Sequence, residues 1–284
     1  MAIETDFLNQ LNKFSLIVRK RVTSTLSGPK KSTRLGKGLA FADHRIYSPG
    51  DDIRNIDWKV YARTDDLYIK NYEEEKNLTV HVLIDSSDSM NFGDKVKKFD
   101  YAAMLGIGFA YLAARENEKV QYATFSEKIE ILPAQRGVSQ VMNMVYMLNN
   151  TKPKGPSNIK DSVFQYKKLI GSRALIVLIS DFLFKTEDAI ETLNYLGDHE
   201  IKVIHVLDPL EKELKFEGDY TLRDSETKDN LRVYISQRLR QGYIQKLDEH
   251  SRKLQEACIK LGISYHQVTT DTPLFDAFYT ILAE

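Results

Sequence analysis

From residue 77 onward, short apolar runs alternate with segments of helical periodicity. Six runs rich in Val, Ile and Leu predict strands at 78–84, 119–125, 128–134, 173–180, 201–207 and 263–269. Between and after them, apolar residues recur every three or four positions, which predicts helices at 95–117, 138–148, 159–169, 189–196, 237–261 and 273–282. We therefore predict an α/β fold, with a doubly wound, mostly parallel six-stranded sheet and helices on both faces.

The first quarter of the chain has a different pattern. Residues 4–26 show helical periodicity, and a loop rich in Gly, Ser and Lys follows. Pro49-Gly50 marks a turn, and the stretch DLYIKNYEEE is typical of a strand. We predict two parts: an N-terminal helix and β extension over 1–76, and the α/β domain over 77–284.

Composition narrows the classes of function. Forty acidic residues balance forty basic ones, so no global charge favours nucleic acid, and no apolar run approaches the roughly 18 residues of a membrane span. Residues 13–37 hold a local excess of Lys and Arg, which predicts either a solvated helix and loop or a peripheral contact with acidic partners or lipid head groups. A single cysteine, Cys258, is typical of a reducing compartment, so we expect a cytoplasmic location.

The candidate chemistry lies where two predicted strands end. The stretch LIDSSDSM closes one strand with Asp85, Ser87 and Ser89, and LISD closes another with Asp181. Right-handed crossovers make these strands neighbours, so both carboxylates meet where the strand order reverses. Ser157, in the Pro/Gly loop before a helix, is predicted either to cap that helix or to face Asp85. Because every candidate ligand is a hard oxygen, we predict a site for Mg²⁺, Mn²⁺ or Ca²⁺.

Two family resemblances rest on these motifs. Asp85, Ser87, Ser89, Ser157 and Asp181 match the metal-ion-dependent adhesion site of von Willebrand factor type A domains, although the loop usually reads GGTD and here reads GPSN. The stretch GKGLAFADHRIYSPGDDIRNIDWKVYARTDDLYIKNYEEE, followed by DSSDSMNFGDK, closely resembles the bacterial family labelled domain of unknown function 58. This resemblance implies a cytoplasmic partner of MoxR-type AAA+ ATPases that helps to mature or remodel client proteins.

A partner surface is a further expectation. Arg54, Asp57 and Trp58 crowd one stretch, which we interpret as local ion pairs around a buried indole, with a docking surface as the alternative. Asn158, beside Ser157, is a candidate partner contact at the metal site. The resemblance to adhesion domains also implies that the last helix, 273–282, shifts when the site is occupied.

Three hypotheses of function follow. The first is a binding module, not an enzyme, that grasps an acidic side chain of a partner through the cation. The second is a metal-dependent phosphohydrolase using Asp85; it would need a further acid two residues later, where the chain has Ser87. The third is a purely structural domain whose site holds no ion. No phosphate loop and no G-x-S-x-G, H-E-x-x-H or C-x-x-C motif is present.

Overall fold

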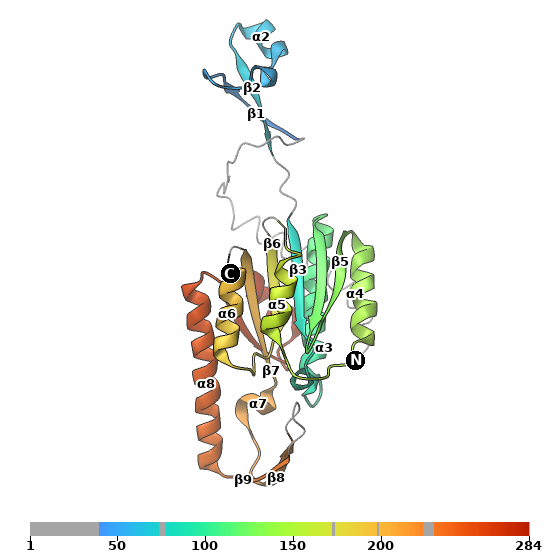
Figure 1. Ribbon diagram of the computed structural model, residues 1–284, viewed down its shortest axis with the longest axis vertical. Coiled ribbons are helices and arrows are strands. Elements are labelled where there is room, and N and C mark those ends of the chain that lie inside the picture. Colours follow the sequence, from blue (N-terminus) through green and yellow to red (C-terminus); the bar gives the residue numbers. More distant parts are fainter. Residues whose placement is uncertain (1–39, 74–77, 172–173, 198, 224–229, 284) are drawn as a thin grey trace. The chain divides into compact units, whose positions relative to one another are not determined.

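The computed structural model describes residues 40–73, 78–171, 174–197, 199–223 and 230–283. These residues fall into two compact units, one before residue 78 and one from residue 78 onward (Figure 1). The helix predicted over 4–26 and the basic stretch 13–37 lie outside the described residues. Within the described ranges, no helix combines the length and the apolar composition that crossing a bilayer requires.

The larger unit is built on a six-stranded sheet. Its strand order is β10-β7-β6-β3-β4-β5, and every neighbouring pair is parallel except β4 and β5. The strands are β3 (Thr79–Asp85), β4 (Lys119–Phe125), β5 (Ile129–Arg136), β6 (Ala174–Ser180), β7 (Glu200–Leu207) and β10 (Ser264–Thr269). The chain runs outward from β3 in one direction and then returns to its other side, so the strand order reverses between β3 and β6.

Helices cover both faces of this sheet. Buried side chains of α3 (Lys98–Arg115), α4 (Val138–Asn150) and α9 (Leu274–Ala283) share one core cluster with the strands. Those of α5 (Ile159–Lys167), α6 (Thr186–Leu196) and α8 (Gln237–Lys260) share the other, and Figure 1 shows α5 and α6 on the near face. The predicted doubly wound α/β fold, mostly parallel, six-stranded and covered on both sides, is confirmed.

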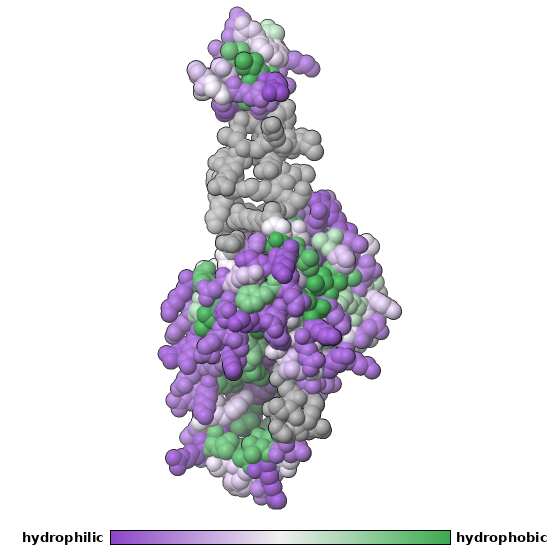
Figure 2. All heavy atoms as spheres, in the orientation of Figure 1, coloured by the Kyte–Doolittle hydropathy of each residue, from purple (hydrophilic) through white to green (hydrophobic). Residues whose placement is uncertain are grey.

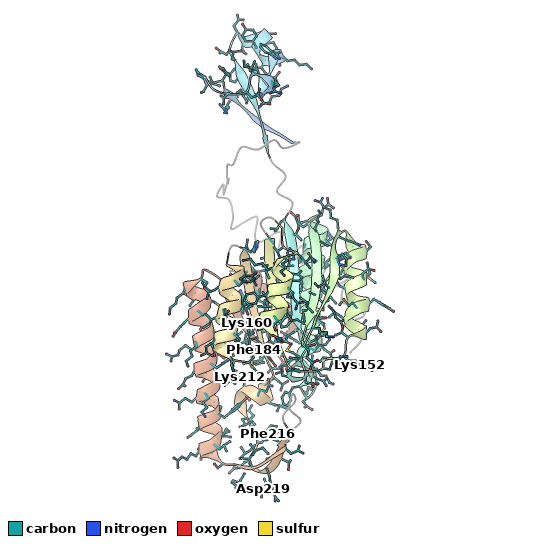
Figure 3. The ribbon with its side chains drawn as sticks, in the orientation of Figure 1. Lys152, Lys160, Phe184, Lys212, Phe216 and Asp219 are labelled. Atoms are coloured by element: carbon teal, nitrogen blue, oxygen red, sulfur yellow. The ribbon has the colours of Figure 1, made fainter. Side chains whose placement is uncertain are left out.

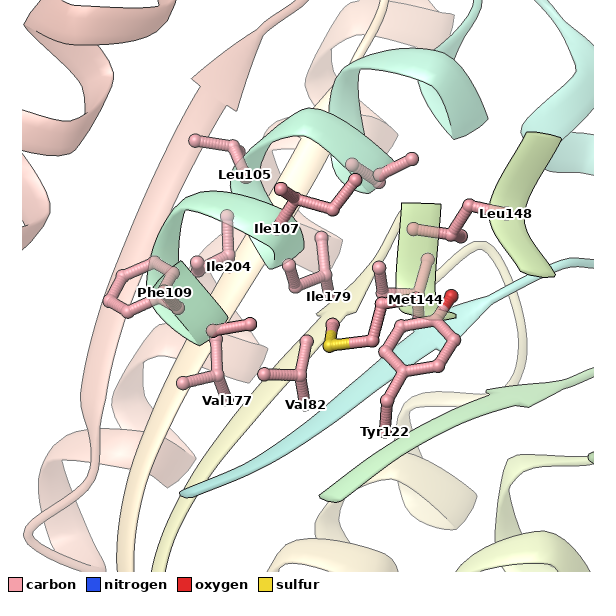
Figure 4. Close-up of a cluster of buried hydrophobic side chains, with 14 of the residues drawn as sticks. Val82, Leu105, Ile107, Phe109, Tyr122, Met144, Leu148, Val177, Ile179 and Ile204 are labelled. Atoms are coloured by element: carbon pink, nitrogen blue, oxygen red, sulfur yellow. The ribbon is translucent and has the colours of Figure 1, made fainter. Parts of the chain in front are cut away.

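The core covers both faces of the central strands β3 and β6. Successive residues of β3 point to opposite faces. Val82 packs with α3 (Figure 4), while Leu83 packs in the cluster that α5, α6 and α8 share. Helix α3 comes close to α9 at Gly108. A Cβ atom at this position would lie only 1.9 Å from the ring of Phe278. A glycine is therefore required for this helix contact.

A hairpin follows β7 in the same unit. The short helix α7 (Pro209–Glu213) leads into β8 (Gly218–Arg223), which pairs antiparallel with β9 (Asn230–Ile235). Tyr220, Leu222 and Leu231 are among its exposed apolar residues, and Figure 2 shows apolar residues gathered over this hairpin. This hairpin occupies the segment between the strand predicted at 201–207 and the helix predicted at 237–261.

The smaller unit is a two-stranded sheet with a helical connection. Strand β1 (Ala40–Ile46) pairs antiparallel with β2 (Tyr68–Glu73), and η1 (Ile53–Asn55) and α2 (Trp58–Thr64) lie between them. Asp57 caps α2 by accepting hydrogen bonds from the amides of Lys59 and Val60. The expectation of a buried indole is wrong: Trp58 is 57% exposed, because it begins a helix with no buried residue.

Candidate metal site at the carboxyl ends of the strands

Asp85 is the centre of the candidate site. It is the last residue of β3 and is fully buried. The hydroxyl of Ser180, at the end of the neighbouring strand β6, donates to Asp85 Oδ2 over 2.7 Å, and the hydroxyl of Ser157 donates to the same atom over 3.0 Å. The amide of Ser87 donates to Asp85 Oδ1 over 2.9 Å. These three donors fix the orientation of the carboxylate.

The serine loop that follows β3 is held by a second loop. The hydroxyls of Ser87 and Ser89 lie 3.0 Å apart at η2 (Asp88–Asn91). The amide of Asp88 donates to the carbonyl of Gly155 and the amide of Lys154 donates to that of Ser86, each over 2.9 Å. These bonds hold the loop that contains Ser157 beside Asp85. Direct hydrogen bonds thus link four of the five predicted ligands, Asp85, Ser87, Ser89 and Ser157.

Asp181, the fifth predicted ligand, is engaged by a buried lysine. Asp181 directly follows β6, and its Oδ2 lies 2.7 Å from Lys98 Nζ, the first residue of α3. The same ammonium lies 2.7 Å from Glu211 Oε1 on α7. The side chain of Lys98 has no solvent exposure, so it forms a buried triplet with the two acids. Asp181 therefore stands at the site with an ammonium already bound to it.

The acidic groups of the site outnumber its one ammonium, that of Lys98, so their charge favours a second cation. Burial raises the pKa of Asp85 to about 6, with a further contribution from the charge of Asp181, while hydrogen bonds from Ser180 and Ser87 act in the opposite direction. Burial lowers the pKa of Lys98, but the charges of Asp181 and Glu211 outweigh it, so the pKa is raised and the ammonium stays charged. Three carboxylates around one ammonium leave two negative charges in excess.

The donor set fits a hard cation. The carboxylate of Asp85 and the hydroxyls of Ser87, Ser89 and Ser157 are oxygen donors of the kind that Mg²⁺, Mn²⁺ and Ca²⁺ prefer. Within the described part of the chain, no group of three or more His, Cys, Asp or Glu is placed to hold a metal, so the donors differ from those of a zinc site. Ser89 and Ser157 are partly exposed, which gives the site access to solvent.

Three residues of the site were missed by the sequence predictions. Ser180 and Asp181 close the same strand, but only the carboxylate was considered. Lys98 lies four positions before the buried Ala102, on the same face of the helix, so a lysine at that position was the available signal. Glu211 is the fourth residue of Asp208-Pro209-Leu210-Glu211, a capping box that begins α7, and that motif could have located it.

The predicted partner residues have different surroundings. Asn158 caps α5. Its side chain accepts a hydrogen bond from the amide of Asp161 and donates one to the carboxylate of Asp161. In the smaller unit, the carboxylate of Asp57 accepts from the amides at the start of α2, and it also contacts His44. Arg54 and Trp58 are exposed. Of this group, Arg54 and Trp58 therefore have side chains accessible to a partner.

The fold and the site together define a class: a doubly wound α/β domain with an oxygen-lined candidate cation site where the strand order reverses. The chain belongs to the family described as protein of unknown function DUF58, whose model matches residues 43–253. It is 26% identical over 223 residues to uncharacterized proteins of Mycobacterium tuberculosis and Mycobacterium bovis, which covers 76% of this chain and 70% of each relative.

Similar solved structures include the conserved hypothetical protein BatB from Bacteroides thetaiotaomicron, with 16% identity and a TM-score of 0.47. The match covers 72% of this chain and 97% of BatB. The SpRpn10 VWA domain is similar at 12% identity and a TM-score of 0.45, over 72% of this chain and 94% of that domain. These likenesses concern the fold.

Proposed function

We propose that this protein is a binding module that grasps a carboxylate of a partner through a divalent cation held at Asp85. The observation that carries the proposal is the arrangement around this residue: a buried, fixed carboxylate with the hydroxyls of Ser87, Ser89 and Ser157 beside it. One carboxylate and three hydroxyls leave coordination positions for water and for one incoming carboxylate. Mg²⁺ is the ion we propose, with Mn²⁺ and Ca²⁺ as substitutes.

The partner we propose is a MoxR-type AAA+ ATPase, together with a client protein that has an acidic residue. Support comes from membership of the DUF58 family and from the resemblance on which that expectation was based. A partner with its own nucleotide site would supply the energy, since this chain has no phosphate-loop motif. Co-purification of the ATPase with the wild-type protein, and its loss with Asp85→Asn, is the expected result. Equal recovery with both proteins would contradict the partnership.

The metal step has its own test. We expect calorimetric titration with Mg²⁺ and Mn²⁺ to show one site, and Asp85→Ala to abolish the binding heat. Ser157→Ala should weaken binding by about tenfold, because it removes one oxygen donor and one hydrogen bond that orients Asp85, together about 1.4 kcal/mol. If the wild type and Asp85→Ala give the same titration, the site holds no ion and the structural hypothesis is the better one.

A route from the site to the last helix supports a role for α9 as a coupling element. The first turn of α3 holds Lys98 at the site and Tyr101, whose hydroxyl donates over 2.9 Å to the carbonyl of Thr272, just before α9. Further along α3, Gly108 packs against Phe278 of α9. A displacement of Lys98 by a bound cation would therefore be transmitted along α3 to α9. Hydrogen exchange of 274–283 with and without Mg²⁺ measures this.

The structure has a lysine that a phosphohydrolase could use, but it lacks, two positions after Asp85, the second acid that such an enzyme would need. A buried lysine beside the acids, Lys98, is a group that phosphoryl chemistry uses. The enzyme would need a second acid two positions after Asp85, however, and that residue is Ser87. The backbone amide of Ser87 donates a hydrogen bond to the carboxylate of Asp85. We expect no turnover of p-nitrophenyl phosphate with Mg²⁺. Turnover that disappears in Asp85→Asn would favour the enzyme.

A further inference from the structure

We infer that the cavity beside the candidate metal site binds an acidic peptide segment of the partner, continuous with the carboxylate that reaches the cation. This inference rests on the proposed function and specifies the partner's chemistry. The cavity measures about 660 Å³ and lies between the end of β4, strand β5, helix α4 and the loop 151–157. Its volume falls in the range of clefts that enclose several side chains.

The cavity and the cation site share their walls. Ser86, which lines the cavity, stands between Asp85 and Ser87 in the chain. The loop that provides Lys152 and Lys154 to the cavity provides Ser157 to the site three residues later. Because the amide of Lys154 donates to the carbonyl of Ser86, the two loops are fixed to each other at this point. A peptide with one side chain at the cation would therefore have its next residues at the cavity.

The charge of the cavity selects the occupant. Three lysines line it, Lys128, Lys152 and Lys154, against one acid, Glu130, which gives a net charge of +2. All three lysine residues are exposed, and no ion pair joins any of them to another of the described residues; Figure 3 shows Lys152 on its loop. Their ammonium groups are available to an anionic ligand, and the acids of a peptide complement them.

An apolar wall adds a second preference. The side chain of Tyr146 on α4 is 75% exposed and lines the cavity together with Met147 and Leu132 of β5. Tyrosine is a frequent anchor at protein interfaces, since its ring contributes contact area and its hydroxyl a hydrogen bond. Lysines beside a tyrosine and a methionine suit a peptide that mixes acidic and apolar side chains. A simple phosphate ion would leave this wall unused.

The test measures binding of a fluorescein-labelled peptide that alternates aspartate and glycine around a central tyrosine. Its twin, with asparagine in place of aspartate, is the ligand control, and fluorescence polarisation with and without Mg²⁺ is the readout. The triple variant Lys128→Gln/Lys152→Gln/Lys154→Gln removes the basic wall. The variant Lys246→Gln/Lys253→Gln/Lys260→Gln removes the same charge from the exposed surface of α8 and is the matched control.

We expect the triple cavity variant to bind the aspartate peptide about tenfold to thirtyfold more weakly, since each exposed charge contact contributes roughly twofold to threefold. Tyr146→Ala should weaken it about threefold, and the control variant should bind as the wild type does. Calorimetric Mg²⁺ binding should be unchanged in the cavity variant, which separates the cavity from the ion site.

Two outcomes would overturn the inference. Equal peptide binding by the cavity variant and the α8 variant shows that the cavity does not hold the peptide, even where Mg²⁺ and Asp85→Asn affect binding. A single-stranded oligonucleotide or inorganic phosphate that displaces the peptide at an equal charge concentration shows a site for polyanions in general. If peptide binding needs the cavity lysines but neither Mg²⁺ nor Asp85, the proposed function is contradicted, while the cavity is still a binding site for an acidic peptide.

Discussion

Replacing Lys98 with methionine tests the electrostatic centre of the site. Methionine has nearly the length of lysine without its charge, so the packing of the side chain at the start of α3 is largely kept. The change removes the ammonium that lies 2.7 Å from Asp181 and 2.7 Å from Glu211. Both acids then share a buried region with Asp85 and have no counter-charge from this helix.

The size of the effect follows from the burial. Removing one partner of a buried ion pair typically destabilises a protein by about 3–5 kcal/mol, because the other charge stays desolvated. Here two acids lose their partner, but Glu211 is partly exposed and burial already raises its pKa, so protonation relieves part of the strain. We therefore expect a loss of about 4 kcal/mol at neutral pH without metal. That is a large share of the roughly 5–15 kcal/mol by which domains are stable.

Urea denaturation followed by circular dichroism, in EDTA and in Mg²⁺, is the assay. Lys97→Met is the matched control, since that neighbouring lysine is exposed and bonds only Asn91 among the contacts described for it. Its loss should cost under about 0.5 kcal/mol. In Mg²⁺ the Lys98→Met protein should regain more stability than the wild type, because the cation then replaces the missing charge.

Two results would refute this reasoning. Unfolding of Lys98→Met at the same urea concentration as Lys97→Met means that the ammonium contributes no net stability. A double variant, Lys98→Met/Glu211→Gln, as unstable as Lys98→Met means that the uncompensated charge of Glu211 is not the cause of the loss. In the expected case, the second change recovers about 1–2 kcal/mol because one unpaired carboxylate becomes a neutral amide.

Two further predictions concern other parts of the chain. Gly108→Ala should destabilise the larger unit by about 1–3 kcal/mol in thermal unfolding, because its Cβ would meet the fully buried ring of Phe278, whereas Gly242→Ala, with open space in α8, should leave it equal or more stable. In the smaller unit, a hydrogen bond with His44 is the largest cause that holds the pKa of Asp57 at about 2, below its usual 3.8. Its contribution is present above pH 3.8 and is lost as the pH falls toward 2, so the fluorescence of Trp58, the single tryptophan, should change in that window. Asp57→Asn should abolish that acid-dependent change.

Periodicity predicted the larger unit well because its elements are long and buried. The continuous apolar run of β6 and the helical spacing of α3 allow few alternatives. The smaller unit was predicted poorly, since β1 lies between the predicted loop and the predicted turn, where no strand was assigned, and α2 has no buried residue to impose a period. The exposure of Trp58 has the same cause: with a core this small, an aromatic residue is not forced inside.

The candidate site shows the limit of local patterns more clearly. Strand ends and crossover direction were enough to place Asp85 beside the strand that ends at Asp181, because topology alone determines that proximity. They could not reveal the pairing of Asp181 with Lys98, which depends on the angle at which α3 begins and on α7. Residues 98, 181 and 211 are far apart in the sequence, and no local pattern joins the lysine to either acid.

This pairing changes how the two acids of the site would act. If a cation binds at Asp85 as proposed, it would compete with the ammonium of Lys98 for the carboxylate of Asp181. Glu211 gives the ammonium a second partner, so Lys98 would still have a counter-charge if Asp181 bound the cation instead. Asp181 would then have two possible partners, and Lys98, the first residue of α3, is the one that it contacts in this structure. Under the proposed function, ion binding at Asp85 would therefore change the ion pairs at the start of α3.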